Sequence, residues 1–166
     1  MPFTPFHFGP NATIGFIAKK YIDLPVFVLV NVTIDIEPLL VMVFGLQYPL
    51  HGYCHTFLIG SLIGALFAIA AYLNKRFILR IMSMFGLPYE ADFKKMLVSS
   101  VLGAWFHVLL DAPIYPDIRP FYPHTLNPLY GIVSPITIYL VCSIFFIPVV
   151  YSYFRFTSQK QKRPNK

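Results

Sequence analysis

Charged side chains are scarce in this sequence. Asp, Glu, Lys and Arg together make up only 12% of its 166 residues, whereas a soluble domain contains about 25%. Hydrophobic residues account for 57%, and the mean hydropathy is +0.63. This balance argues against a soluble protein. It predicts an all-α fold, a polytopic bundle of transmembrane helices, and the length fits one domain.

Other features are rare or missing. Cys54 and Cys142 are the two cysteines and both lie in apolar segments, so a disulfide framework is not indicated. The sequence has neither a Gly-x-Ser-x-Gly motif nor a phosphate-binding loop, which argues against serine-hydrolase and nucleotide chemistry. The N-terminus has no basic region followed by an uninterrupted apolar run, so it does not resemble a cleavable signal peptide.

Positive charge exceeds negative charge, giving a net charge of +6. The basic residues gather in the segments 74–95 and 155–166. Both segments flank apolar runs, as the positive-inside rule expects of cytoplasmic segments, and no folded basic domain remains to bind nucleic acid. We therefore expect an integral protein of the cell (inner) membrane with its C-terminus in the cytoplasm. Residues 1–154 would form one helical membrane domain, and residues 155–166 a basic cytoplasmic tail.

Five apolar segments are candidates to cross the bilayer, which takes about 20 residues. In the alternative, the first of them lies on the membrane surface and four remain. Within the third, Gly60 and Gly64 form a Gly-x-x-x-Gly motif that allows another helix to approach closely, from the same chain or from a second copy. The five segments are 5–18, 24–46, 52–73, 96–113 and 128–153.

Two pairs of ionisable residues are spaced four apart beside the apolar runs: His51 with His55, and His107 with Asp111. Residues at this spacing share one helix face, and such a pair of imidazoles on a helix is typical of metal ligands. The alternatives are interfacial histidines for the first pair. For the second pair, Asp111 could instead orient an imidazole that binds the metal, or the two residues could simply form a buried His–Asp hydrogen bond.

Asp35 and Glu37 lie inside an apolar segment, where ionisable groups are costly. In a straight helix they would point about 200° apart, so one carboxylate would face lipid. Pro38 disfavours a helical conformation for the residue before it. We therefore expect a broken helix near Asp35–Pro38 with both carboxylates turned into the protein. The alternative is a surface loop between two short helices.

Two further residues are candidates for the site. His7 precedes the first apolar segment, although a lone histidine there is more often interfacial than a ligand. Arg119 follows the fourth segment, where its planar guanidinium could clamp a phosphate or carboxylate. It could equally form a salt bridge with Asp117, which contributes little if exposed.

The order of these motifs resembles a known family. An N-terminal His7, the Asp35-x-Glu37-Pro38 segment, the His51-x-x-x-His55-Thr56 motif and the final His107-x-x-x-Asp111 pair cover most of the chain. This set resembles the membrane-bound metal-dependent hydrolases, the YdjM-like inner-membrane proteins. More distantly it is similar to zinc-dependent phospholipase C and P1-type nucleases. The resemblance implies a small polytopic helical protein with a divalent metal.

We therefore predict a membrane-embedded metal-dependent hydrolase whose site faces away from the cytoplasm. The metal would be zinc, with manganese or iron as alternatives, and the substrate a lipid or another phosphoester. Asp35 and Glu37 would supply the general base or a second metal site, and Arg119 would bind the substrate. The alternatives are a metal or proton transporter or sensor, and a structural membrane protein. The predicted metal ligands are His7, His51, His55, His107 and Asp111.

Overall fold

The computed structural model describes residues 5–161, and within that range it contains helices and no strands. This confirms the all-α prediction. Eight α-helices and one short 3₁₀ helix follow one another along the chain. They are α1 (Pro5–Ile17), α2 (Leu24–Ile34), α3 (Ile36–Phe44), η1 (Tyr53–His55), α4 (Phe57–Leu73), α5 (Lys75–Met84), α6 (Phe93–Asp111), α7 (Pro135–Ile144) and α8 (Phe146–Gln161).

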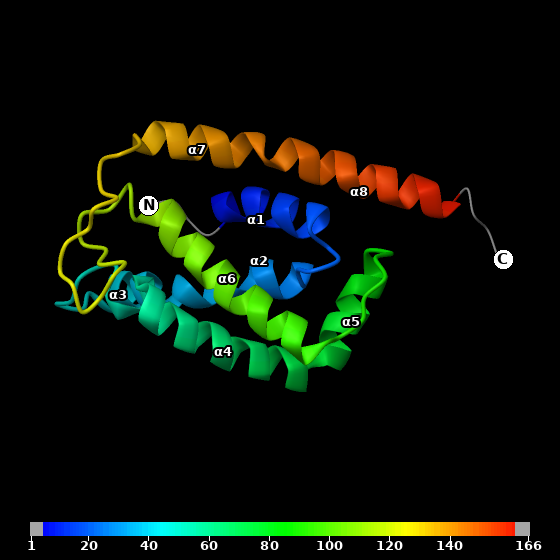
Figure 1. The fold of residues 1–166 in the computed structure, drawn as a ribbon, viewed down its shortest axis with the longest axis horizontal. Coiled ribbons are helices and arrows are strands. Elements are labelled where there is room, and N and C mark those ends of the chain that lie inside the picture. Colours follow the sequence, from blue (N-terminus) through cyan, green and yellow to red (C-terminus); the bar gives the residue numbers. More distant parts are fainter. Residues whose placement is uncertain (1–4, 162–166) are drawn as a thin grey trace.

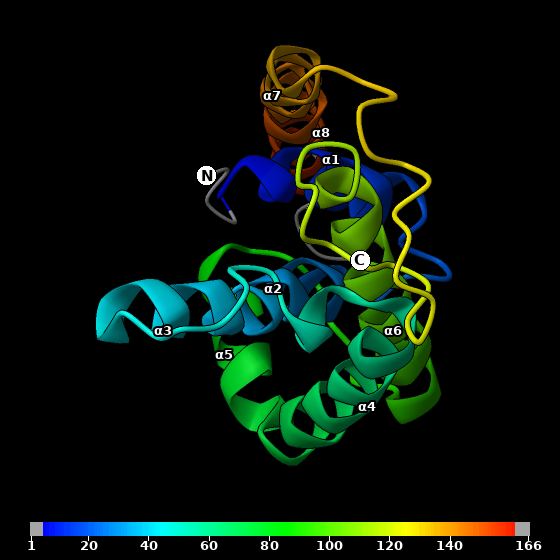
Figure 2. The same cartoon turned by 90° about the vertical axis from the view of Figure 1, so that its left-hand side faces the viewer.

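Helix α6 is central to the bundle. It packs against α4 on one side and against α2 on another, and α1 lies between α2 and the α7–α8 pair. Figure 1 shows α7 and α8 as one long rod along the edge of the molecule, with α1 beneath it. In the perpendicular view of Figure 2, α3 projects from the end of α2 away from the other helices.

The prediction of five crossings is wrong for the described part of the chain. Three helical segments are long and apolar enough to span a bilayer: Leu24–Phe44, Phe93–Asp111 and Pro135–Ser158. The pair α4–α5, bent by 76°, makes four if it counts as one broken span. Helix α1 has 13 residues, which gives about 20 Å at 1.5 Å per residue, whereas the hydrocarbon core is about 30 Å thick.

Helix α1 is not a surface helix either, since it contacts α2, α6, α7 and α8. Its side chains at His7, Asn11 and Thr13 are buried, and the Thr13 hydroxyl donates a 2.8 Å hydrogen bond to the carbonyl of Phe145. The four crossings of the alternative prediction agree with the upper count of candidate spans, but residues 5–18 pack among the other helices. A short helix interrupted by Gly9 and Pro10 can still fold here because the surrounding helices bury it.

The predicted break near Asp35–Pro38 is present as a one-residue interruption. Helix α2 ends at Ile34 and α3 begins at Ile36, with Asp35 at φ −74° and ψ −4° between them. A proline cannot donate a hydrogen bond to the carbonyl four residues before it, and that carbonyl belongs to Ile34. Asp35 and Glu37 remain part of one candidate span, Leu24–Phe44, so α2 and α3 still continue one another despite the interruption.

The glycine motif packs within the chain. A Cβ atom on Gly64 would lie 3.0 Å from the Cα of Val101, and one on Gly60 would lie 3.8 Å from the Cβ of Ala104. Ala68, four residues further, is fully buried. Helix α4 therefore uses its row of small residues to approach α6, which answers the question that the sequence left open.

The C-terminal helix crosses the expected boundary between membrane domain and tail. Helix α8 runs without a break through residue 154 to Gln161. The remaining basic residues of the predicted tail, Lys162, Arg163 and Lys166, lie outside the described residues. Large apolar side chains are exposed on the outer faces, among them Leu66 at 67% and Ile147 at 68%. Such a surface suits a membrane protein, as the sequence predicts.

Candidate metal centre

Three separate parts of the chain bring ionisable side chains to one end of the bundle. Asp35 comes from the junction of α2 and α3, His55 from η1, and His107 and Asp111 from α6. The prediction that His107 and Asp111 share one helix face is confirmed, because Nε2 of His107 and Oδ2 of Asp111 are 3.3 Å apart. Ligands from different elements are therefore gathered at one point by the packing of the helices.

These four residues form a tight group. One ligand atom from each lies within 4.8 Å of all the others. The Nε2 atoms of His55 and His107 are 3.3 Å apart. Oδ1 of Asp35 is 3.3 Å from Nε2 of His107 and 3.7 Å from Nε2 of His55. Asp35, predicted as a catalytic group, thus joins the potential ligands.

The hydrogen bonds of His107 fix which of its nitrogens carries a proton. The Asn31 amide donates to the carbonyls of Phe27 and Val28 at 3.0 and 2.9 Å, so its oxygen must point the other way. That oxygen lies 3.2 Å from Nδ1 of His107. An amide oxygen is only an acceptor, so Nδ1 carries the hydrogen and Nε2 presents its lone pair to the group.

His55 is oriented in the same manner by a carboxylate. Its Nδ1 atom lies 3.5 Å from Oε2 of Glu37, which also accepts a 3.0 Å hydrogen bond from the backbone N–H of Cys54. A proton on Nδ1 leaves the Nε2 lone pair directed at the other ligands. Histidines that bind metals typically have such a partner at their second nitrogen. Glu37 thus contacts the ring nitrogen of His55 that faces away from the other ligands.

The donor set suits a tetrahedrally coordinated divalent ion. Zinc bonds of 2.0–2.1 Å to nitrogen and oxygen imply ligand–ligand distances of about 3.3–3.4 Å. Nε2 of His107 is 3.3 Å from the ligand atom of each of the other three residues. Nε2 of His55 is 3.7 Å from Asp35 and 3.9 Å from Asp111. A positive charge near the four atoms, either a metal ion or a proton on an imidazole, offsets the repulsion between the two carboxylates. Asp35, His55, His107 and Asp111 are therefore placed so that they could hold a metal ion.

His7 lies beside this group and not within it. Its Nε2 atom is 3.2 Å from Oδ1 of Asp111, the oxygen that faces away from the other ligands, and its ring packs edge-on against His107. The two atoms are not aligned as a hydrogen bond, and both lack another partner although both residues are buried. His7 is thus placed to hold Asp111 and not to reach the point where the four ligand atoms meet.

The predicted helix that would carry both His51 and His55 is wrong. Residues 51–52 lie in an irregular segment, η1 covers only Tyr53–His55, and α4 begins after the N-cap Thr56. The His51 and His55 rings still touch, with centroids 4.8 Å apart. The two rings face different partners, and His51 is not among the four potential ligands.

Asp117 is the partner of His51. It accepts a 2.9 Å hydrogen bond from the His51 backbone N–H, and its other oxygen is 3.1 Å from Nδ1. Burial disfavours the ionised form of Asp117, but these two contacts outweigh it and hold its pKa below the ordinary value. Burial and then the neighbouring His55 lower the pKa of His51, against the effect of Asp117.

Arg119 lines a small cavity next to this pair. The cavity measures about 130 Å³ and is bordered by His51, Asp117, Tyr48 and Tyr122. Because the carboxylate of Asp117 binds His51, the salt bridge with Arg119 that the sequence left open is not needed to explain Asp117. None of the four potential ligands lines this cavity.

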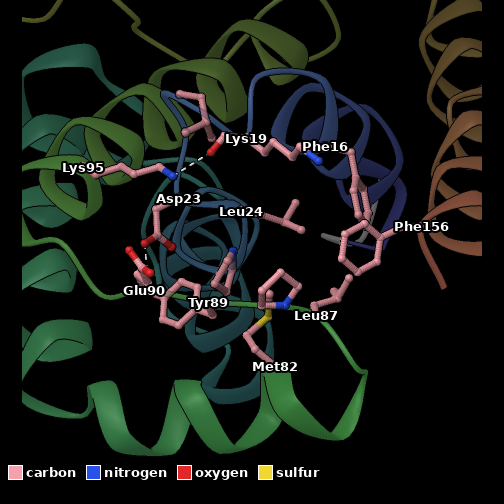
Figure 3. A pocket seen from close by; sticks show the side chains of 13 residues that line it. Phe16, Lys19, Asp23, Leu24, Met82, Leu87, Tyr89, Glu90, Lys95 and Phe156 are labelled. Carbon is pink, nitrogen blue, oxygen red and sulfur yellow. Dashed lines mark hydrogen bonds between the residues drawn. The ribbon is translucent and has the colours of Figure 1, made fainter. Parts of the chain in front are cut away.

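A second cavity lies at the opposite end of α2 and is separate from the metal centre. It measures about 160 Å³, and Figure 3 shows apolar side chains such as Phe16 and Phe156 on one side and charged ones on the other. The buried Asp23 carboxylate accepts a 2.8 Å hydrogen bond from the Tyr89 hydroxyl. Burial raises the pKa of Asp23, although the bonds from Tyr89 and from the Val26 backbone N–H oppose this effect.

Asn31 is the residue of the centre that the sequence analysis missed. It lies four residues before Asp35, so the two share a helix face. That spacing was a usable signal, but a neutral amide in an apolar helix does not by itself indicate a metal site. Asn11 on α1 donates to the Asn31 oxygen at 3.3 Å, so a polar chain runs from α1 through α2 to His107.

Comparisons with known proteins found no match to this chain among protein-family models, curated proteins or solved structures.

Proposed function

We propose that this protein is a membrane-embedded metal-dependent hydrolase. The observation that supports the proposal is the convergence of two imidazole nitrogens and two carboxylate oxygens within 4.8 Å, three of the four residues being buried. The motif order and its resemblance to membrane-bound metal-dependent hydrolases add the reaction class. The C-terminus would lie in the cytoplasm and the centre near the opposite membrane face, as the distribution of basic residues predicts.

The residues divide into ligands and supporting groups. Asp35, His55, His107 and Asp111 would hold the ion. A divalent ion at such a site lowers the pKa of bound water and polarises a phosphoryl or carbonyl oxygen. Zinc is our first choice, with manganese and iron as alternatives, because mixed imidazole and carboxylate ligands suit all three.

The remaining steps belong to side chains of this chain. Water adds to phosphorus, the bond to the leaving alkoxide breaks, and one proton of the water ends on that alkoxide. Glu37 would carry this proton through Oε1, which accepts a long 3.5 Å hydrogen bond from the Tyr48 hydroxyl, whereas Oε2 accepts a 3.0 Å bond from Cys54 and lies 3.5 Å from Nδ1 of His55. Arg119 would bind the anionic part of a phosphoester from the cavity beside His51.

One observation favours a second candidate, a structural metal site. Structural zinc sites use four protein ligands, whereas catalytic sites keep one position open, and four ligand atoms are gathered here. The partial exposure of Asp35, whose side chain is 18% accessible, favours the hydrolase, because this ligand borders the outside and could yield its position to water.

The first test is the metal content of protein purified in detergent. Wild type is compared with the double variant His55→Ala/His107→Ala, and with His124→Ala, a matched control on an exposed histidine away from the group. We expect close to one ion per chain in wild type and the control, and none in the double variant. A folded wild type that holds no ion even after zinc, manganese or iron is supplied contradicts the proposal.

The second test is hydrolysis of a chromogenic phosphodiester. Activity should disappear with a chelator and return when the ion is restored. An ion that is bound at full occupancy and stabilises the fold, without any hydrolysis by wild type, would identify the centre as structural.

A further inference from the structure

The four potential ligands are not equally accessible. The side chains of His55, His107 and Asp111 are exposed by 2% or less, whereas those of Asp35 and the adjoining Glu37 are exposed by 18% and 13%. Among the described residues of the group, the start of α3 carries the accessible side chains and is therefore where a substrate would meet the centre. The approach along α3 decides what kind of molecule arrives.

An apolar groove leads to this opening. It lies between α3, the following loop and α4, has a volume of about 510 Å³, and Glu37 is its only charged residue. Binding pockets for small organic ligands are commonly of this size. The groove is lined chiefly by Ile36, Leu40 and Val41 of α3, Leu46 of the loop and Ile63 of α4.

The groove borders a segment that is long and apolar enough to span the membrane. Helix α3 is the second half of the candidate span Leu24–Phe44, and Figure 2 shows it projecting away from the bundle. Its side chains at Leu39, Leu40 and Val43 are 44%, 44% and 66% exposed. In a bilayer these surfaces meet hydrocarbon and not water, so an acyl chain is the molecule that fills the groove.

Tyr48 separates the groove from the cavity that Arg119 lines. It borders both spaces, and its hydroxyl donates to Oε1 of Glu37 at 3.5 Å. An apolar compartment and a compartment lined by Arg119, whose neighbour Asp117 is bound to His51, thus meet at Tyr48. A molecule that fills both has an apolar chain at one end and an anionic group at the other.

We propose that the substrate is an amphiphilic ester that enters sideways from the bilayer, with its acyl chain in the groove beside α3 and its anionic group on the Arg119 side of Tyr48. This inference rests on the proposed hydrolase function. It adds the direction of entry and the recognition of the chain. Short water-soluble esters then lack the contacts of the groove and bind more weakly.

Leu40 and Leu39 provide a matched pair for the test. Both are on α3 and both are 44% exposed, but only Leu40 lines the groove. Leu40→Trp should fill the groove, and Leu39→Trp should add the same ring on another face. The probes are p-nitrophenyl hexadecyl phosphate and p-nitrophenyl methyl phosphate, which differ only in the chain.

We expect Leu40→Trp to lower kcat/KM for the hexadecyl probe by about tenfold or more, since displacing two buried CH₂ groups already has this effect. Leu39→Trp should leave it unchanged, and neither variant should alter hydrolysis of the methyl probe. Equal hydrolysis of the hexadecyl probe by both variants overturns the inference and leaves the hydrolase intact.

A binding measurement decides the inference even if wild type hydrolyses neither probe, which would contradict only the proposed function. Vesicles containing a phosphatidylglycerol with a photoactivatable diazirine on its acyl chain are irradiated, and the labelled positions are mapped by mass spectrometry. Labelling concentrated on Ile36, Leu40 and Leu46, and reduced in Leu40→Trp, supports the groove. Labelling that is equal at Leu39, or crosslinks to a second copy of the chain in its place, overturns it.

Discussion

Asn31 on α2 accepts a hydrogen bond from Nδ1 of His107 on α6, with 3.2 Å between the two atoms. The Asn31 amide nitrogen donates to two carbonyls of its own helix, so the direction of its oxygen does not depend on His107. The contact therefore directs the lone pair on the far side of the imidazole toward His55, Asp35 and Asp111. Asn31, a neutral residue outside the ligand group, thus determines which ring nitrogen of His107 carries the proton.

Replacement of this residue should weaken metal binding. Asn31→Leu keeps the side chain near its size but removes the acceptor for His107, and loss of such an orienting partner typically lowers metal affinity by about 10–100-fold. The affinity is measured by competition with a chelator in detergent. Thr13→Val, which removes another buried hydrogen bond between helices, is the control and should bind metal as wild type does. Unchanged affinity in Asn31→Leu would show that Asn31 does not orient His107.

A larger side chain on the small-residue face of α4 should destabilise the bundle. Even the first carbon of Leu in Gly64→Leu would lie 3.0–3.1 Å from backbone atoms of Val101 and Ser100, and the helices must move apart. Overpacking of this kind costs about 1–3 kcal/mol. Thermal unfolding in detergent measures the loss. Ala70→Leu on the exposed face of the same helix is the control, and equal melting temperatures for the two variants would contradict the close packing of α4 on α6.

The stability of the other end of the bundle should depend on pH through Asp23. Its pKa is raised in the folded state by burial, so the folded protein holds this proton at pH values where the unfolded chain, with a pKa of about 3.9, has released it. The contribution of Asp23 to stability is therefore largest below about pH 3.9, declines as pH rises toward its folded pKa, and stays low above it.

The measurement is the melting temperature of wild type and Asp23→Asn at a series of pH values. The amide oxygen can still accept the bond from the Val26 backbone N–H, the amide NH₂ can donate to the Tyr89 hydroxyl, and the amide does not titrate. We expect the variant to gain on wild type as pH rises through this window. Asp92→Asn changes an exposed N-cap on α6 and controls for the loss of a capping charge. A melting temperature of Asp23→Asn that falls relative to wild type as pH rises would contradict the prediction.

The sequence by itself determined the helical class and the apolar character, and it named the four residues of the ligand group, although not Asn31. Apolar runs and i, i+4 spacing are local properties, so the pairing of His107 with Asp111 on one face of α6 follows from helix geometry alone. The interruption at Asp35 likewise follows from Pro38, since a proline acts on its own helix. Neither requires knowledge of what packs against the helix.

The tertiary structure alone decided which of these residues meet. His51 and His55 have the same spacing as His107 and Asp111, but the chain is irregular there, and only His55 enters the ligand group while His51 binds Asp117. The number of candidate spans also fell from five to three or four, because α1 is short and buried among other helices. Distances between helices are fixed by contacts such as that of Gly64 with Ser100. The residues that make such contacts lie far apart in the sequence, so no local pattern encodes the distances between the helices.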